Sequence, residues 1–104
     1  MRRGEIWWAQ QPEPVGKRPV LLLSRDEAYN VRNAVTVAQL TTVIRNIPVE
    51  VMLGRKDGLP KECAANLDTI TTIRKSLLLQ KICTLSLEKM DDVDRAIRFA
   101  LGIE

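Results

Sequence analysis

Apolar residues in this chain come only in short runs, and this brevity is the strongest constraint on its fold. The clearest run, Val20–Leu23, is four residues long, whereas a membrane-spanning helix needs about 20. Elsewhere apolar and polar residues alternate, as in Val35–Val43 and Pro48–Leu53, which is the period of a β-strand. The chain therefore predicts a small strand-rich fold with no membrane-spanning segment.

The length of 104 residues supports one domain, residues 1–104, with a core that needs neither a metal nor disulfides. Met1–Glu5 do not begin a secretory signal, so we expect a cytoplasmic protein. Cys63 and Cys83 are then expected to be reduced core thiols. Residues 1–85 carry thirteen bases and eight acids, a net charge of +5, which is compatible with a polyanionic partner. On charge alone, a solvated surface with a slight positive excess is the favoured interpretation.

The absence of histidine excludes several kinds of catalysis. No Ser-His-Asp triad, no Cys-His pair and no histidine general base can form within a chain that has no histidine. Two cysteines 20 residues apart are a poor basis for a zinc site. We therefore expect no metal and no cofactor.

Turn residues divide the chain into five or six expected short strands and two helical segments. The expected strands are residues 4–9, 18–23, 35–43, 48–53, 63–70 and 77–83. The second strand is apolar almost throughout, so we expect it to be central and covered on both faces.

Two helical segments complete the predicted fold. Ser24 and Glu27 have the spacing of a capping box, which predicts a helical turn to about Asn30. Ser86 and Gly102 bound a closing helix whose apolar residues recur at helical spacing. The fold class is mostly β (α+β): a small barrel with a helical turn after the second strand and a C-terminal helix.

A few polar residues stand at strand ends, where chemistry could gather. They are Arg18, Thr41–Thr42, Asp68–Thr69, Thr71–Thr72 and Arg74–Lys75. If those ends meet, one rim of the barrel would collect an arginine, several hydroxyls and an acid. From spacing alone, the simpler interpretation is stronger, because threonine favours strands.

The tryptophans are adjacent in sequence and therefore lie on opposite faces of a strand. We expect a structural role for Trp7. For Trp8 two roles stay open: a contact in a dimer, or a platform on which a base stacks.

Six blocks in order resemble the MazF/PemK toxin family, and the similarity covers essentially the whole chain. The most specific are the RGEIW of Arg3–Trp7 and the GKRPVLLLS of Gly16–Ser24. The others are 37–42, 48–51, 66–73 and 85–97. The resemblance implies an SH3-like barrel of the CcdB/PemK type.

The resemblance also implies an activity: a type II toxin, or mRNA interferase, that cleaves single-stranded RNA sequence-selectively without metal. Family members attack with the substrate's own 2′-OH and leave a 2′,3′-cyclic phosphate and a 5′-OH. The family's catalytic residues map onto Arg18 and Thr41. The further RNA-binding positions that we carry over are Arg3, Lys17, Thr42, Asp68, Thr69, Thr71 and Arg74. The implied partners are single-stranded RNA, a second copy of the chain and an acidic, MazE-like antitoxin.

Some positions depart from the family pattern. Thr69 stands where glutamine is usual and Thr71 where arginine is usual, and the loop before Arg18 lacks the common acidic-polar insert. These changes bear on base recognition more than on the reaction.

Two other functions stay open: a CcdB-like gyrase poison and an inactive nucleic-acid-binding SH3-like module. Retention of both Arg18 and Thr41 favours the nuclease over these alternatives.

Overall fold

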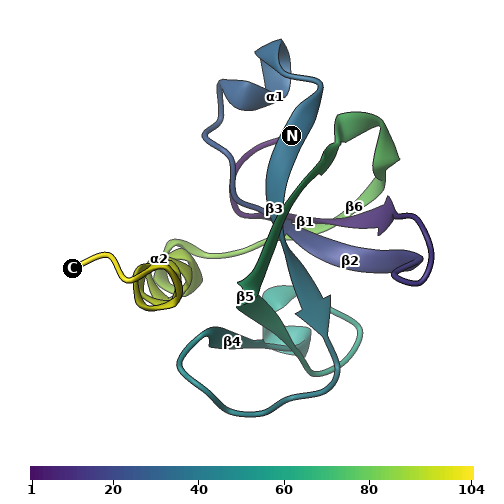
Figure 1. The fold of residues 1–104 in the computed structure, drawn as a ribbon. Helices are drawn as coiled ribbons and strands as arrows, with labels where there is room; N and C mark the ends of the chain where they lie inside the picture. The colour runs from purple at the N-terminus through teal and green to yellow at the C-terminus, as the bar shows by residue number, and fades with distance from the viewer.

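Six antiparallel strands form one curled sheet in the order β4-β5-β3-β2-β1-β6 (Figure 1). A computed structural model describes residues 1–104. The strands are β1 (Glu5–Gln10), β2 (Lys17–Leu22), β3 (Ala34–Thr41), β4 (Glu50–Leu53), β5 (Cys63–Arg74) and β6 (Leu78–Thr84). The helices are α1 (Ala28–Val31) and α2 (Leu87–Leu101), and short 3-10 turns lie at Arg55–Asp57 and Lys75–Leu77. The predicted mostly-β fold with a C-terminal helix is confirmed, with the sheet curled into a half-barrel whose edge strands β4 and β6 are not paired with each other.

Strand β2 lies between β1 and β3, as its apolar sequence predicts. Val20, Leu21 and Leu22 have no solvent exposure although consecutive residues of a strand point to opposite faces. Both faces of β2 are therefore covered, and the prediction of a central strand is confirmed.

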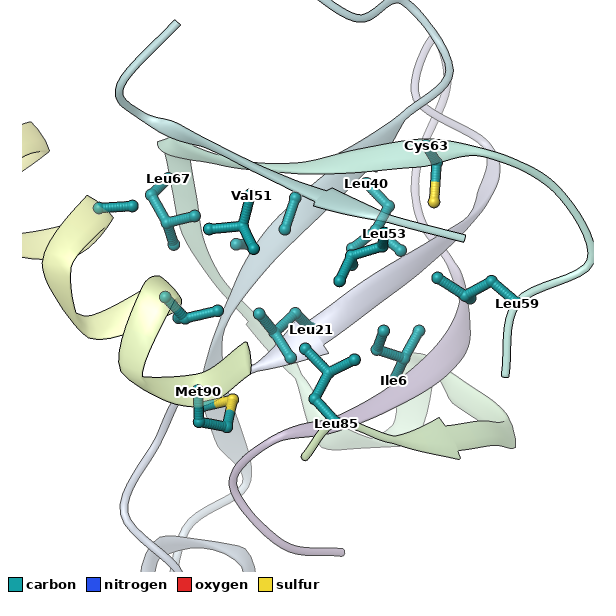
Figure 2. Close-up of a cluster of buried hydrophobic side chains, with 14 residues drawn as sticks. Ile6, Leu21, Leu40, Val51, Leu53, Leu59, Cys63, Leu67, Leu85 and Met90 are labelled. Carbon is teal, nitrogen blue, oxygen red and sulfur yellow. The ribbon is translucent and has the colours of Figure 1, made fainter. Parts of the chain in front are cut away.

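Each face of the sheet carries its own apolar cluster. The larger cluster of 14 buried residues fills the space between the curled sheet, including its edge strand β4, and the helix α2. Figure 2 shows it running from Met90 and Leu85 beside the helix to Leu59 and Cys63 at the other end. The smaller cluster of seven lies on the opposite face, where Tyr29 of α1 and Leu78 of β6 cover Val20 and Val37.

A bulge interrupts the pairing of β3 with β5. Ala38 pairs with Ile70, but the next residue, Gln39, pairs with Asn66, so residues 67–69 have no partner in β3. The side chain of Leu67 enters the larger cluster, while Asp68 and Thr69 stay exposed. The pairing then resumes, which carries β5 to Arg74, four residues beyond the predicted end.

The closing helix has the predicted boundaries. Ser86 Oγ accepts a hydrogen bond from the backbone N–H of Lys89 at 3.1 Å, and Gly102 ends the helix with a φ of +70°. Neither α1 nor α2 is long and apolar enough to cross a membrane.

The predicted capping box at Ser24 is wrong. Helix α1 starts later, with Glu27 at its N-cap and no side-chain cap. The reason is that Ser24 Oγ accepts a hydrogen bond from Thr36 N–H at 2.8 Å, which ties it to β3. The Ser24 carbonyl accepts another from the Tyr29 hydroxyl at 3.1 Å.

Candidate functional site

Arg18 and Thr41 lie on neighbouring strands at the same end of the sheet. Val20 of β2 pairs with Gln39 of β3, and continuing that register by two residues brings Arg18 level with Thr41. Both residues line the same two surface hollows. The structure thus brings together the two residues that the resemblance marks as catalytic.

One of these depressions, which we call the polar hollow, has a volume of about 320 Å³. Its lining residues are Val15, Arg18, Gln39, Thr41, Val43, Arg45, Asn66 and Thr69. They include two guanidinium groups, two amides and two hydroxyls, and no carboxylate. Such a lining attracts an anion, since planar guanidinium groups match phosphate oxygens.

The second depression, the apolar hollow, has a volume of about 300 Å³ and shares Arg18, Thr41 and Val43 with the first. Its other lining residues are Trp8, Pro19, Leu40, Thr42, Leu59, Pro60, Lys61, Cys63 and Ile82. Arg18 and Thr41 therefore form a ridge between a polar and an apolar surface.

The two tryptophans take different roles. Trp7 packs against the smaller cluster and donates a hydrogen bond from Nε1 to Glu5 Oε1 at 2.8 Å, which makes it structural as expected. Trp8 lines the apolar hollow, and Lys17 Nζ lies 5.4 Å from the centroid of its ring. The ammonium group of Lys17 is thus placed over the Trp8 ring, although Lys17 lines neither hollow.

A carboxylate shapes the loop between β3 and β4. Glu50 Oε1 accepts hydrogen bonds from the backbone N–H groups of Arg45 and Asn46, both at 2.9 Å. Asn46 has a φ of +57°, the left-handed region that asparagine tolerates better than most residues. The loop therefore has a defined path that places Arg45 beside the polar hollow.

An amide pair joins the loop between β1 and β2 to the sheet. Gln11 Nε2 donates to Gln39 Oε1 at 3.1 Å, and Gln39 Nε2 donates to Gln11 Oε1 at 2.6 Å. Gln11 is only 6% exposed. Gln39 also lines the polar hollow, next to Thr41.

The bulge in β5 separates two of the predicted RNA contacts. Thr69 lines the polar hollow and donates a hydrogen bond from Oγ1 to the carbonyl of Asn66 at 2.9 Å. Asp68 lines neither hollow, and its backbone N–H donates to Asn66 Oδ1 at 2.9 Å. Asp68 is therefore not beside the Arg18–Thr41 pair.

The expectation of a single rim is wrong for the end of β5. Arg74 pairs with Ala34, seven residues along β3 from Thr41, which corresponds to about 23 Å of strand. Thr71 is exposed opposite Val37, part of the way along. The long bulged strand carries these residues away from Arg18.

Arg3 is used within the fold. Its Nη2 donates to Asp94 Oδ1 at 2.7 Å and its Nε to the carbonyl of Leu23 at 3.1 Å, while its backbone N–H donates to Asp26. The guanidinium thus ties α2 to the end of β2, and Arg3 lines neither hollow.

Titratable groups near the site have perturbed pKa values with clear causes. Burial raises the pKa of the Cys63 thiol, and the charge of Asp57 adds to this. Burial also raises the pKa of Cys83, again with a contribution from Asp57. Both cysteines are free, and Cys63 is buried as expected, whereas Cys83 is half-buried. Both thiols thus stay protonated near neutral pH and are poor nucleophiles.

Three polar residues of the polar hollow were not predicted from the sequence: Gln39, Arg45 and Asn66. Gln39 had a readable signal, because it follows Val35 and Val37 at strand spacing and so places an amide on a core-facing side. Arg45 had none, because its position depends on a loop that Glu50 shapes.

The fold places this chain in a class of small toxins. A family profile described as the PemK-like, MazF-like toxin of type II toxin–antitoxin systems matches residues 2–101, and the chain belongs to that family.

Among its relatives are two Mycobacterium tuberculosis proteins. The probable endoribonuclease MazF5 is 35% identical over 100 residues, which cover 95% of this chain and 91% of the relative. The probable endoribonuclease MazF2 is 34% identical over 103 residues, which cover 98% of this chain and 99% of the relative.

Solved structures agree with this assignment. The Mycobacterium tuberculosis toxin MazF-mt6 superposes with a TM-score of 0.89 at 29% identity, covering 96% of this chain and 98% of that toxin. A mycobacterial endoribonuclease in complex with its cognate antitoxin has a TM-score of 0.88 at 27% identity. The match covers 100% of this chain and 97% of that endoribonuclease.

Proposed function

We propose that this chain, residues 1–104, is an endoribonuclease toxin that cleaves single-stranded RNA without a metal ion. The relatives named as endoribonucleases support the activity. The observation that carries it is the polar hollow, in which Arg18 and Thr41 meet beside Arg45 with no carboxylate in the lining. This lining favours a phosphodiester over a cationic or neutral substrate.

The proposed reaction uses the RNA's own 2′-OH. The 2′-oxygen forms a bond to phosphorus while the bond from phosphorus to the 5′-oxygen breaks, giving a 2′,3′-cyclic phosphate and a 5′-OH. Negative charge builds up on the non-bridging oxygens, which the Arg18 guanidinium binds through two N–H groups. The Thr41 hydroxyl donates a weaker hydrogen bond to the same oxygens. The 2′-OH gives up its proton to solvent water. Arg18 is our proposed donor of the proton to the leaving 5′-oxygen, and it regains a proton from solvent afterwards.

The residues around the ridge would hold the RNA chain. Lys17 and Arg45 are cationic neighbours of Arg18 that suit the flanking phosphates. Thr42 and Thr69 line the two hollows and can donate hydrogen bonds to the nucleotides there. Trp8 offers an aromatic surface in the apolar hollow on which a base can stack.

We propose two protein partners, a second copy of the chain and an acidic, MazE-like antitoxin. A two-fold dimer would lengthen the shallow groove of one small barrel. The excess of five positive charges over residues 1–85 suits an acidic antitoxin, and one structural neighbour was solved with its cognate antitoxin. Such a toxin would act in the cytoplasm, where its RNA is.

Incubating the purified protein with a long RNA in EDTA tests the proposal. We expect cleavage, with 5′-OH and cyclic phosphate ends identified by end-labelling and mass spectrometry. Abolition of cleavage by EDTA with rescue by magnesium would refute the mechanism. Binding without cleavage would favour the inactive nucleic-acid-binding module, and inhibition of gyrase without RNA cleavage would favour the CcdB-like poison.

A further inference from the structure

The end of the β1–β2 hairpin is poorly attached to β3. The pairing of β2 with β3 covers only Val20–Leu22, and Pro19 has no N–H with which to extend it. Arg18 is paired with Ala9 of β1, while Thr41 is paired with Ala64 of β5. Arg18 is therefore held by the pairing of β2 with β1, and Thr41 by the pairing of β3 with β5. The direct pairing of β2 with β3 ends before it reaches either residue.

The amide pair of Gln11 and Gln39 bridges this gap. Beyond Val20, its two reciprocal hydrogen bonds, of 2.6 and 3.1 Å, are the ones that join the hairpin to β3. Gln11 is the first residue after β1, and its backbone N–H donates to the carbonyl of Gly16 at 2.9 Å, which closes the loop. The pair thus connects the loop that precedes Arg18 to the strand that carries Thr41.

We propose that Gln11 and Gln39 are positioning residues that hold Arg18 in register with Thr41. This inference rests on the proposed function. Two hydrogen bonds between planar amides fix both distance and orientation, which a single contact would not. Catalysis by a preorganised donor depends on such placement, because an error of about 1 Å can lower a rate by about 100-fold.

Gln11 is buried and Gln39 is half-buried, so Gln11 in particular depends on its partner for its side-chain hydrogen bonds. A buried amide that loses its hydrogen-bond partner still carries the free-energy cost of desolvation, and no hydrogen bond offsets it. Replacing either glutamine with leucine therefore releases the loop from β3. Gln10 is a matched control, because it is an adjacent, exposed glutamine whose side chain makes no hydrogen bond within the protein.

The experiment compares Gln39→Leu, Gln11→Leu and Gln10→Leu in single-turnover cleavage of one RNA. For the first two variants we expect the rate to fall about 10- to 100-fold. The Kd for an RNA with a 2′-deoxy residue at the cut should change less than threefold. The Gln10→Leu variant should match the wild type.

A double-mutant cycle separates positioning from a general loss of stability. In an Arg18→Lys background the effect of Gln39→Leu should largely disappear, because the positioned guanidinium is already gone. Full additivity of the two changes, or an unchanged rate in both single glutamine variants, would overturn the proposal.

Hydrogen exchange provides a readout that is independent of RNA cleavage. The Gly16 and Val15 amides should exchange faster in Gln39→Leu than in Gln10→Leu if the pair holds the loop. Unchanged exchange would overturn the proposal even if the wild type is active. A wild type that leaves RNA intact would refute the proposed function, whereas the exchange result would still decide whether the pair holds the loop.

Discussion

Replacing Arg18 with alanine should reduce cleavage far more than it reduces RNA binding. The substitution removes the one guanidinium that lines both hollows beside Thr41, but it leaves Arg45 in the polar hollow and Lys17 beside Trp8. Removing a preorganised donor to transition-state charge typically lowers the rate by about 10²–10³, or about 2.7–4 kcal/mol. Loss of the proposed proton donor would add to that figure.

Two further variants calibrate the size of this effect. Arg18→Lys keeps the charge but not the two parallel hydrogen bonds, so its rate should lie between those of the wild type and the alanine variant. Thr41→Ala removes a neutral hydroxyl, which is worth about 0.5–1.5 kcal/mol, or roughly a 2- to 12-fold loss of rate. The loss of cleavage rate should therefore be largest for Arg18→Ala. Arg18→Lys and Thr41→Ala should each lose less.

The assay is single-turnover cleavage with enzyme in excess, paired with the Kd for a 2′-deoxy-blocked RNA. Arg25→Ala serves as the charge-matched control, since Arg25 is exposed and lines neither hollow. Urea denaturation verifies that each variant is folded. A folded Arg18→Ala protein with near-normal turnover would remove Arg18 from the mechanism, as would an equal loss in Arg25→Ala.

Other predictions concern stability and the thiols. The pKa of Glu5 lies below its ordinary value of 4.5, because hydrogen bonds from Trp7 and the backbone of Arg2 and the charge of Lys81 outweigh the effect of burial, which alone would raise it. The charged carboxylate of Glu5 therefore stabilises the fold fully above the ordinary pKa of 4.5. Glu5→Gln should lower the free energy of unfolding by about 1–2 kcal/mol at pH 7. The deficit should disappear as the pH falls through the lower pKa of the folded state; an equal deficit in urea melts at pH 7 and pH 3 would contradict this. Leu67→Ala should cost about 2–5 kcal/mol in the same melts, because Leu67 is fully buried, and a loss below 1 kcal/mol would show that the bulge does not anchor β5. Alkylation of Cys63 by iodoacetamide should be slow at pH 7.5 and accelerate as the pH rises, because its pKa is raised; fast reaction at pH 7.5 would argue for an open thiolate.

The sequence allowed the strands and the closing helix to be predicted because local patterns determine them. Alternation in β3 and the cap and stop of α2 at Ser86 and Gly102 act within a few residues. The capping box at Ser24 failed because a residue twelve positions away, Thr36, takes the serine hydroxyl.

The ridge could be predicted only in part. The Arg18–Thr41 pair followed from the resemblance alone. The position of Arg74 did not, since it depends on the bulge at residues 67–69, which lengthens β5 and moves its end away from the site. Arg45 depends on the hydrogen bonds of its loop to Glu50.

The place of β1 in the sheet has a consequence for the timing of synthesis. This first strand lies between β2 and β6, so one of its two edges gains a partner only after residues 78–84 have been made. Arg3 likewise waits for Asp94, 91 residues later. A ribosome adds about 5–20 residues per second, so the N-terminal strand stays incomplete for several seconds while the rest of the chain is made. Arg18 and Thr41 emerge early, yet the sheet that carries them is complete only when the chain is nearly finished. The ridge of Arg18 and Thr41 should therefore reach its final arrangement only when synthesis of the chain is nearly complete.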